Sequence, residues 1–304
     1  MRKAIERVLS RGGKADPTRG PVVELCNVGL ELTNPRARLS RSEGRGRIFS
    51  CLGELCWYLS GSNSVDPIAY YISAYQGESE DGVVHGGYGA RLFGWDGADQ
   101  IRNVIRLLQE KPSSRRAVIQ LFDHEDINAP HKEVPCTCTM QFMLRDKKLD
   151  LTTYMRSNDV YLGLPHDIFS FTMIQELVAR SLGASLGAYT HFVGNLHLYD
   201  RNEEQVRSFL KEGWQSTKTY MPEMPEGDQW ENVRLLLSFE EAVRQGSVTC
   251  EVPTSLDPYW ADIARLLQIH ALSKRKNLSE VREVQQMMNS SQYQLYVDSR
   301  LQKG

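Results

Sequence analysis

The chain has 304 residues, of which 41% are hydrophobic and 24% charged, and its formal net charge is −2. This composition is ordinary for a soluble globular protein. The near-neutral charge argues against wholesale binding to nucleic acid or a membrane surface, although a local group of arginines could still bind a small anion. Residues 1–13 lack the apolar run of a signal peptide and no stretch is long enough to span a membrane, so we expect a cytoplasmic protein.

The cysteines and histidines do not form a metal-binding pattern. The six cysteines are Cys26, Cys51, Cys56, Cys136, Cys138 and Cys250. Without an export signal we expect them to be reduced thiols. The only close pair, Cys136 and Cys138, has no second pair at zinc-finger spacing, so we predict no metal site.

The first part of the chain predicts a strand followed by three helices. After a short helix and polar loop in residues 1–18, residues 22–32 alternate as a strand does. Helical spacing of apolar residues follows in 47–61, 66–76 and 99–111.

The second part predicts a hairpin, a helix and a further strand, and then only helices. Residues 117–122 predict a buried strand, and residues 141–144 and 149–154 alternate around a polar turn, as a hairpin does. The remaining predictions are a helix at 167–182, a strand at 188–199, and Leu-rich helices at 203–212, 231–243, 259–274 and 278–300. We see no linker, and we expect a single catalytic domain over 1–304, with a core of about 15–202 and a helical C-terminal extension of about 203–304.

Several polar residues have both a structural and a functional interpretation. Glu54 lies in an apolar helix, where a carboxyl group must find a partner, stay protonated or face a cavity, unless it lies on an exposed helix face. Arg115 and Arg116 directly precede a strand and could bind a phosphate together, or could simply form a basic loop. Arg19 also has two interpretations, because a turn exposes it: it could bind a phosphate, or it could be a solvated loop residue.

The stretch from Glu133 to Asp167 concentrates reactive and charged residues. Cys136 follows a proline, a strand pattern comes next, and Arg156 and Ser157 precede a Leu-Gly-Leu-Pro-His-Asp segment that ends at Asp167. A packed core does not need this chemistry close to one cysteine, whereas a nucleophilic active site does. Cys138 is the other candidate nucleophile, but it could instead be a small residue that packs against its neighbours.

Six motifs resemble the thymidylate synthase superfamily over roughly residues 15–202. In chain order they are Glu54-Leu55-x-Trp57-Tyr58-Leu59-Ser60-Gly61, Tyr88-Gly89 with Arg91, Pro112-x-Ser114-Arg115-Arg116, Pro135-Cys136 with Gln141-Phe142, Arg156-Ser157-x-Asp159-x-x-Leu162-Gly163-x-Pro165, and Gly194 with His197-x-Tyr199. Each motif alone is modest evidence, but six in order are specific. The resemblance implies an α/β (α+β) fold, with a mixed sheet, surrounding helices, and a homodimer formed through the sheet.

The resemblance also implies a set of roles for this site. The substrate would be a pyrimidine nucleoside monophosphate, and the one-carbon donor would be 5,10-methylenetetrahydrofolate. Cys136 would be the nucleophile, with Glu54 and Tyr88 handling protons near the base. The residues implied to bind the nucleotide are Arg19, Arg115 and Arg116 (these two from the partner subunit), Gln141, Arg156, Ser157, Asp167, His197 and Tyr199. Those implied to contact folate are Trp57, Asp159 and Gly163.

Three departures from the family pattern narrow the expected reaction. Asp167 stands where the thymidylate-forming members have Asn, and a carboxyl group suits the amino group and N3 of cytosine, unless Asp167 only caps the following helix. Thr137 replaces a common His. Asn195 in place of an Asp is a smaller, fourth departure that has no part in this prediction. The chain ends in a polar stretch in place of a short apolar tail that would exclude water from the site.

These departures predict a cytidylate 5-hydroxymethylase, in which water adds to the transferred one-carbon unit. We expect dCMP more than CMP as the substrate. The alternatives are a thymidylate synthase that methylates dUMP and a non-catalytic nucleotide-binding homologue. Intact Glu54, Tyr88, Cys136 and Arg156 argue against the second of these.

Overall fold

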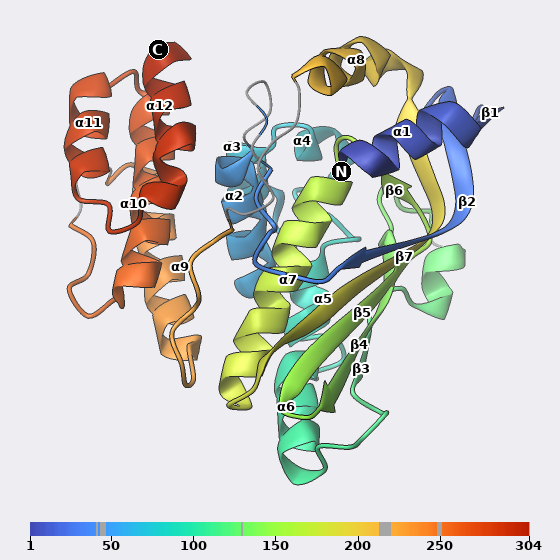
Figure 1. The fold of residues 1–304 in the computed structure, drawn as a ribbon, viewed down its shortest axis with the longest axis horizontal. Helices are drawn as coiled ribbons and strands as arrows, with labels where there is room; N and C mark the ends of the chain where they lie inside the picture. Colours follow the sequence, from blue (N-terminus) through green and yellow to red (C-terminus); the bar gives the residue numbers. More distant parts are fainter. Residues whose placement is uncertain (41, 43–46, 129, 213–219, 248–250, 304) are drawn as a thin grey trace.

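The computed structural model describes residues 1–304 except 41, 43–46, 129, 213–219, 248–250 and 304. Its centre is a seven-stranded mixed sheet in the order β1-β2-β7-β5-β4-β3, with β6 paired to β7 beside this path (Figure 1). The β5–β7 and β6–β7 pairs are parallel and the others are antiparallel. The strands are β1 Gly13–Ala15, β2 Val22–Leu32, β3 Val118–Gln120, β4 Thr137–Arg145, β5 Lys148–Met155, β6 Asn158–Asp159 and β7 Ser185–Tyr199.

Helices cover one face of the sheet in successive layers (Figure 1). Helix α7 lies directly against the sheet and is buried along most of its length, because it packs on β5 and β7 with one side and on α2 with the other. The helices are α1 Arg2–Arg11, α2 Ile48–Leu59, α3 Val65–Tyr71, α4 Tyr75–Glu78, α5 Tyr88–Phe93, α6 Gln100–Glu110, α7 Leu164–Ser181, α8 Glu203–Lys211, α9 Trp230–Gln245, α10 Pro258–Lys274, α11 Leu278–Gln286 and α12 Gln294–Lys303.

The C-terminal helices continue the core of the sheet domain. Helix α10 is buried almost throughout and contacts α2, α9, α11 and α12. One cluster of buried apolar side chains runs without interruption from α2 through α7 to α12. Figure 1 shows α9–α12 on the side of α2 that faces away from the sheet.

The opposite face of the sheet carries partly exposed apolar side chains. On β5, Leu149, Leu151 and Met155 point into the core, as strand alternation requires. Tyr154 and its neighbour Phe192 on β7 point the other way and are 44% and 47% exposed. This face is therefore apolar at its centre and open to solvent in the single chain.

Most predicted elements are confirmed, and four need correction. The predicted helix at 66–76 is two short helices, α3 and α4, with a break at residues 72–74. The strand at 22–32 has the predicted bounds, and the hairpin forms as β4 and β5. The predicted buried strand at 117–122 is wrong in extent, because only 118–120 pair and Val118 lies 44% exposed on the edge strand β3.

The other two corrections concern helix ends. The predicted helix at 278–300 is two helices, since the Asp262 carboxylate binds the backbone N–H groups of Asn289 and Ser290 and turns the chain there. Helix α7 begins at Leu164, three residues earlier than predicted, with Pro165 in a position that a first helical turn accepts. Among the described residues, no helix is both long and apolar enough to cross a membrane, and five cysteines are free thiols, with Cys250 outside that set.

Candidate active site

Cys136 lies just before β4, at a bulge in the β4–β5 pair between Thr137 and Thr139. Its carbonyl oxygen accepts the backbone N–H of Arg156 at 2.8 Å, which joins the cysteine to the segment after β5. Burial raises the pKa of the Cys136 thiol to about 12, and the nearby charges of Glu133 and Asp167 add to the effect of burial, while Arg156 opposes it. Arg156 and Arg19 favour the thiolate, but desolvation of the thiol outweighs them in the single chain.

Tyr88 begins α5 and contacts the strand that carries the nucleophile. Its hydroxyl oxygen accepts the backbone N–H of Thr137 at 3.1 Å, and its ring stacks on Phe171. Burial raises the pKa of Tyr88, as do the charges of Asp167 and Cys136, which places all three side chains in one electrostatic neighbourhood.

Glu54 is buried in the middle of α2, so the alternative of an exposed helix face is wrong. The hydroxyl of Tyr75 donates to Glu54 Oε1 at 2.8 Å, while Glu54 Oε2 is buried without a hydrogen-bond partner among the described residues. Burial, followed by the charge of Asp167, raises the pKa of Glu54 to about 8. Glu54 can therefore hold or release a proton near neutral pH.

Asp167 ends a line of four hydrogen-bonded side chains. Asn158 Nδ2 donates to Asp167 Oδ2 at 2.6 Å, and Asn158 Oδ1 lies 3.3 Å from His191 Nε2. Tyr189 Oη lies 2.7 Å from His191 Nδ1, and burial lowers the pKa of His191 to about 3, so the ring is neutral. Because the Asn158 oxygen must accept, Nε2 of His191 carries the proton and Nδ1 accepts from Tyr189.

The environment of Asp167 suits a protonated carboxyl group. Asp167 lies in the first turn of α7, whose N-cap is Gly163, so the capping alternative is wrong. Burial raises the pKa of Asp167 to about 7, although the Asn158 hydrogen bond opposes the shift. A Cβ atom on Gly163 would lie 3.1 Å from Asn158 Nδ2 and 3.4 Å from Asp167 Oδ2, so glycine leaves this pair its space.

Asp159 shapes the turn before α7. Its Oδ1 accepts the backbone N–H groups of Tyr161 and Leu162, each at 2.7 Å. Its Oδ2 is buried and has no partner in the described part of the chain. In β6, Asp159 lies beside His197 of β7, and its negative charge opposes the lowering of the His197 pKa that burial causes.

Two predicted phosphate ligands lie close to Cys136. Arg156 Nε and Nη2 donate to the carbonyl oxygens of Pro135 and Val134, at 2.9 and 3.1 Å. Arg19 pairs with Glu78 and Glu133, at 2.6 and 2.7 Å. The positive charges of both arginines favour the thiolate of Cys136. Ser157, next to Arg156, is partly buried.

Other predicted nucleotide ligands lie on β7 near Arg19. The imidazole of His197 and the ring of Tyr199 meet edge to face, 4.9 Å apart. Arg201 lies 3.8 Å from the Tyr199 ring centre and donates to the carbonyl oxygen of Arg19 at 2.9 Å. Arg201 thus adds a guanidinium group that the motifs did not indicate.

The unusual Asn195 has a structural explanation. Its Nδ2 donates to Glu24 Oε2 at 2.7 Å, and its Oδ1 lies 3.1 Å from His197 Nδ1. An aspartate could accept from His197 but could not donate to Glu24, and the two carboxylates would repel each other. Glu24 of β2 therefore accounts for an amide at this position.

Three predicted ligands lie apart from the Cys136 group. Arg115 and Arg116 are exposed next to the edge strand β3, and Gln141 donates to the carbonyl oxygen of Arg115 at 3.0 Å. Gln141 is five residues from Cys136, about 16 Å along an extended strand. Trp57 is only 2% exposed, its indole N–H donates to the carbonyl oxygen of Ser64 at 2.9 Å, and its ring meets that of Tyr75 edge to face, 5.3 Å apart.

A cavity of about 330 Å³ opens near the start of α2. Ser50 of its lining lies 3.0 Å from Nε2 of His166, the residue before Asp167. Arg47 and Arg300 also line it, so α12 contributes a positive charge to this end of the site. The remaining lining residues are Phe49, Tyr71, Ile72, Ser73, Ala74 and His270.

Comparison with known sequences identifies the family. Residues 45–229, more than half of the chain, match the family described as thymidylate synthase. The chain belongs to the thymidylate synthase family. A deoxyuridylate hydroxymethyltransferase of Bacillus phage SP01 is 30% identical over 210 residues, which are 64% of this chain and 55% of that protein. The matched part thus spans little more than half of the length of this relative.

A solved structure supports the same relationship. The crystal structure of thymidylate synthase from T4 phage superposes with a TM-score of 0.60 and 25% identity, over 71% of this chain and 81% of that one. The predicted mixed α/β fold of the thymidylate synthase type is therefore confirmed. The matched family segment contains every predicted site residue except Arg19.

Proposed function

We propose that this thymidylate synthase family member transfers a one-carbon unit from 5,10-methylenetetrahydrofolate to carbon 5 of a cytidine monophosphate. Water then adds to give the 5-hydroxymethyl product, with dCMP preferred over CMP. The observation that carries the proposal is Asp167, a buried carboxyl group whose pKa is raised to about 7 and whose orientation is held by Asn158.

Asn158 gives the two oxygens of Asp167 different roles. Because Asn158 donates to Oδ2, that oxygen accepts, and the proton of a neutral Asp167 resides on Oδ1. A carboxyl group held this way can accept from the 4-amino group of cytosine with Oδ2 and donate to N3 with Oδ1. Cytosine recognition therefore requires the protonated form of Asp167.

The proposed chemistry begins at Cys136. Its sulfur adds to carbon 6 of the pyrimidine, and the proton that it loses passes to a neighbouring base. Carbon 5 then attacks the methylene carbon of the folate. A base removes the proton from carbon 5 and tetrahydrofolate leaves from the methylene carbon, which gives an exocyclic methylene group. Addition of water to this group and loss of the Cys136 sulfur complete the hydroxymethyl product. Glu54, poised near neutral pH, and Tyr88 would move the protons.

Substrate binding would help to activate Cys136. Arg19 and Arg156 lie near the thiol, and we propose that both turn from their present carboxylate and carbonyl partners to the phosphate of the nucleotide. Ser157, His197 and Tyr199 would contact the phosphate and sugar. A second subunit would add Arg115 and Arg116 from its exposed edge, and the apolar sheet face around Tyr154 and Phe192 would form the dimer interface.

The cavity beside α2 is our candidate for the folate site. Folate ends in a glutamate with two carboxylates, and Arg47 and Arg300 offer two guanidinium groups. His166 and Ser50 connect this cavity to Asp167, so a pterin ring would lie between the cavity and the base, close to Asp159 and Gly163. We also infer one catalytic domain over the whole chain, supported by the continuous core between α2 and α12.

A second candidate substrate is deoxyuridylate. The Bacillus phage relative is named for that substrate, and its name also supports a hydroxymethyl product. A neutral Asp167 could serve uracil if Oδ1 faced the O4 atom and Oδ2 faced N3–H. The two bases therefore differ in which oxygen of Asp167 lies opposite carbon 4.

Incubation with dCMP, CMP or dUMP and methylenetetrahydrofolate separates these candidates. We expect 5-hydroxymethyl-dCMP by mass spectrometry, without the rise in dihydrofolate absorbance that hydride transfer produces. A hydroxymethyl product from dUMP alone would favour the second candidate. Rising dihydrofolate with dUMP would instead identify a methylating enzyme, and no product or carbon-5 exchange with any nucleotide would leave only a binding function.

A further inference from the structure

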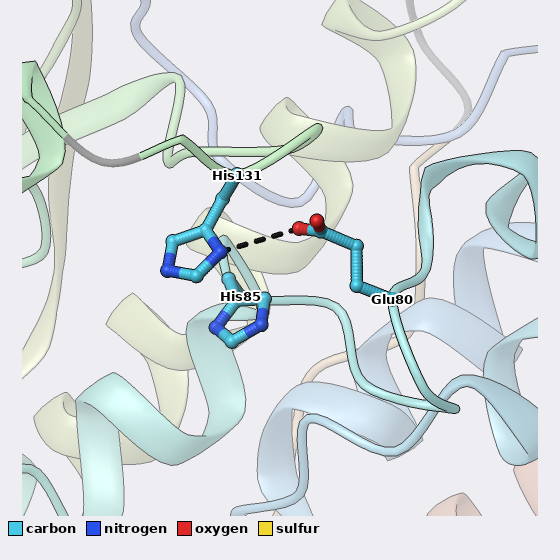
Figure 2. Close-up of side chains that lie close together, drawn as sticks. All are labelled: Glu80, His85 and His131. Carbon is cyan, nitrogen blue, oxygen red and sulfur yellow. Dashed lines mark hydrogen bonds and ion pairs between the residues drawn. The ribbon is translucent and has the colours of Figure 1, made fainter.

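Two histidines and a glutamate from separate segments meet on the outside of the Cys136 loop. Figure 2 shows Glu80, His85 and His131 with their polar ends directed toward one another. One nitrogen or oxygen atom from each lies within 4.8 Å of the others, and all three side chains are partly buried. The imidazole rings stack with centroids 3.5 Å apart, and His131 Nδ1 lies 3.2 Å from Glu80 Oε2.

The backbone around this cluster is firmly held. Arg91 donates to the carbonyl oxygen of His85 and forms a two-point ion pair with Asp126, at 2.6 and 2.7 Å. A Cβ atom on Gly86 would lie 2.9 Å from the carbonyl carbon of Val134, so the two segments are in direct backbone contact. The backbone N–H of Lys132 also donates to Glu80 Oε2, at 3.1 Å. The Arg91–Asp126 pair and the Gly86–Val134 contact therefore hold the His85 segment against the loop of His131 without using the three side chains.

This set of donor atoms suits a divalent transition metal ion. Two imidazoles and one carboxylate are a common protein ligand set for zinc, in which water takes the fourth position. Ligand atoms around a tetrahedral zinc ion lie about 3.3 Å apart, so atoms now within 4.8 Å need only a small movement. The rings are nearly parallel, at 12°, and one must tilt for both lone pairs to reach one ion.

We propose that Glu80, His85 and His131 form a zinc-binding site that joins the segment before α5 to the loop that leads to Cys136. His131 is followed in that loop by Glu133, which binds Arg19, and by Val134 and Pro135, whose carbonyl oxygens bind Arg156. A metal ion on His131 would fix this loop at its N-terminal end. It would thereby stabilise the segment that positions the nucleophile and both nearby arginines.

Equilibrium dialysis of the metal-free full-length chain against Zn²⁺ tests the proposal. We expect one ion per chain, and at least about tenfold weaker binding in each of Glu80→Gln, His85→Gln and His131→Gln, as losing a group that supports a metal typically causes. His124→Gln is the matched control, because His124 is 86% exposed and pairs with Asp123 outside the cluster. Its affinity should equal that of the unaltered chain.

Two further measurements separate this site from thiol binding and from misfolding. Co²⁺ bound in place of zinc should show no thiolate charge-transfer band, because the site offers only nitrogen and oxygen. Zn²⁺ should also protect His85 and His131 of the unaltered chain, but not His124, from carbethoxylation measured by mass spectrometry. No stoichiometric binding, binding that survives all three substitutions, or a thiolate band would each overturn the proposal.

Discussion

The side-chain amide of Asn158 donates to the carboxyl group of Asp167 across 2.6 Å, and thereby decides which carboxyl oxygen can carry a proton. The Asp167→Asn substitution replaces that carboxyl group with an amide, which offers a donor to O4 and an acceptor to N3–H of uracil. We expect kcat/KM to shift from dCMP toward dUMP by about 100-fold or more, since each unpaired buried polar group costs about 1–3 kcal/mol. Competition between the two nucleotides measures the ratio, and unchanged base selectivity would argue against the role of Asp167.

We expect Asn158→Ala to lower the activity, and to change the base preference less than Asp167→Asn does. The Asn158 hydrogen bond lowers the pKa of Asp167, so its loss should raise that pKa and keep Asp167 protonated to higher pH. The alkaline limb of the kcat/KM profile for dCMP, expected near pH 7, should therefore move upward, while kcat/KM falls by about tenfold because Asp167 is less well oriented. Tyr189→Phe, at the far end of the same line of hydrogen bonds, should show the same direction of change but a smaller one. A limb that moves downward would contradict this account.

Cys136 and Cys138 provide a matched pair for testing the nucleophile. Addition at carbon 6 labilises the hydrogen on carbon 5, so tritium from [5-³H]dCMP should appear in water when the enzyme is active. Cys136→Ser should abolish this release, whereas Cys138→Ser should retain most of it. Equal losses in both variants, with normal thermal unfolding, would mean that Cys136 has no special role.

Ionisation of Glu54 should lower the free energy of unfolding as the pH rises. Its pKa is raised from an ordinary 4.5 to about 8 in the folded chain, so the folded state binds a proton more tightly than the unfolded state. The stability from this protonation is complete below about pH 4.5 and is lost as the pH rises toward 8. Glu54→Gln keeps a neutral side chain, and we expect its unfolding free energy to exceed that of the unaltered chain by about 5 kcal/mol at pH 8.5.

Urea unfolding at pH 5 and pH 8.5 measures this difference, which should nearly disappear at the lower pH. Activity should fall in the same variant, since an amide cannot transfer a proton. A pH-independent difference would show that Glu54 does not change its ionisation on folding in this range.

Arg116 should act on the site of the other subunit. Arg116→Ala and Cys136→Ser should each be inactive alone, but mixing the two after mild unfolding should restore activity. One site in each mixed dimer then combines an intact Cys136 with an intact Arg116 from its partner, which predicts about a quarter of the unaltered activity for random pairing. Mixing Cys136→Ser with Arg156→Ala is the control, because Cys136 and Arg156 are expected to serve the site of their own chain. In that mixed dimer one site lacks Cys136 and the other lacks Arg156, so neither is complete. Restoration in the control alone would refute the shared site.

Local patterns predicted the strands and most of the helices well. Alternation gave β2 its bounds because one face of that strand packs on the core and the other does not. Failures occurred where a distant residue decides the local structure. Asp262 of α10 binds the backbone of residues 289 and 290, and no pattern within 278–300 could reveal that turn.

The same distinction holds for the site. Motif residues such as Glu54, Tyr88, Cys136 and Asp167 do lie together, although their predicted roles remain predictions. The sequence did not indicate Tyr75, Asn158 or His191, which set the proton positions of that group. Asn158 lies inside a recognised motif but at a variable position, and His191 is significant only because folding brings its Nε2 within 3.3 Å of Asn158 Oδ1. The three candidate metal ligands likewise come together through a backbone contact at Gly86, not through a short spacing.

The pairing of β2 with β7 also has a consequence for biosynthesis. Val22 lies opposite Tyr199, so β2 emerges from the ribosome long before its partner strand exists. At ordinary translation rates this delay is roughly 10 to 35 s. Throughout that time one side of β2 offers its backbone hydrogen-bonding groups to any other extended chain, and only β1, on the opposite side, is already available. The nascent chain therefore passes through a period of exposure to misassembly, and Asn195, His197 and Tyr199 can join β2 only when that period ends.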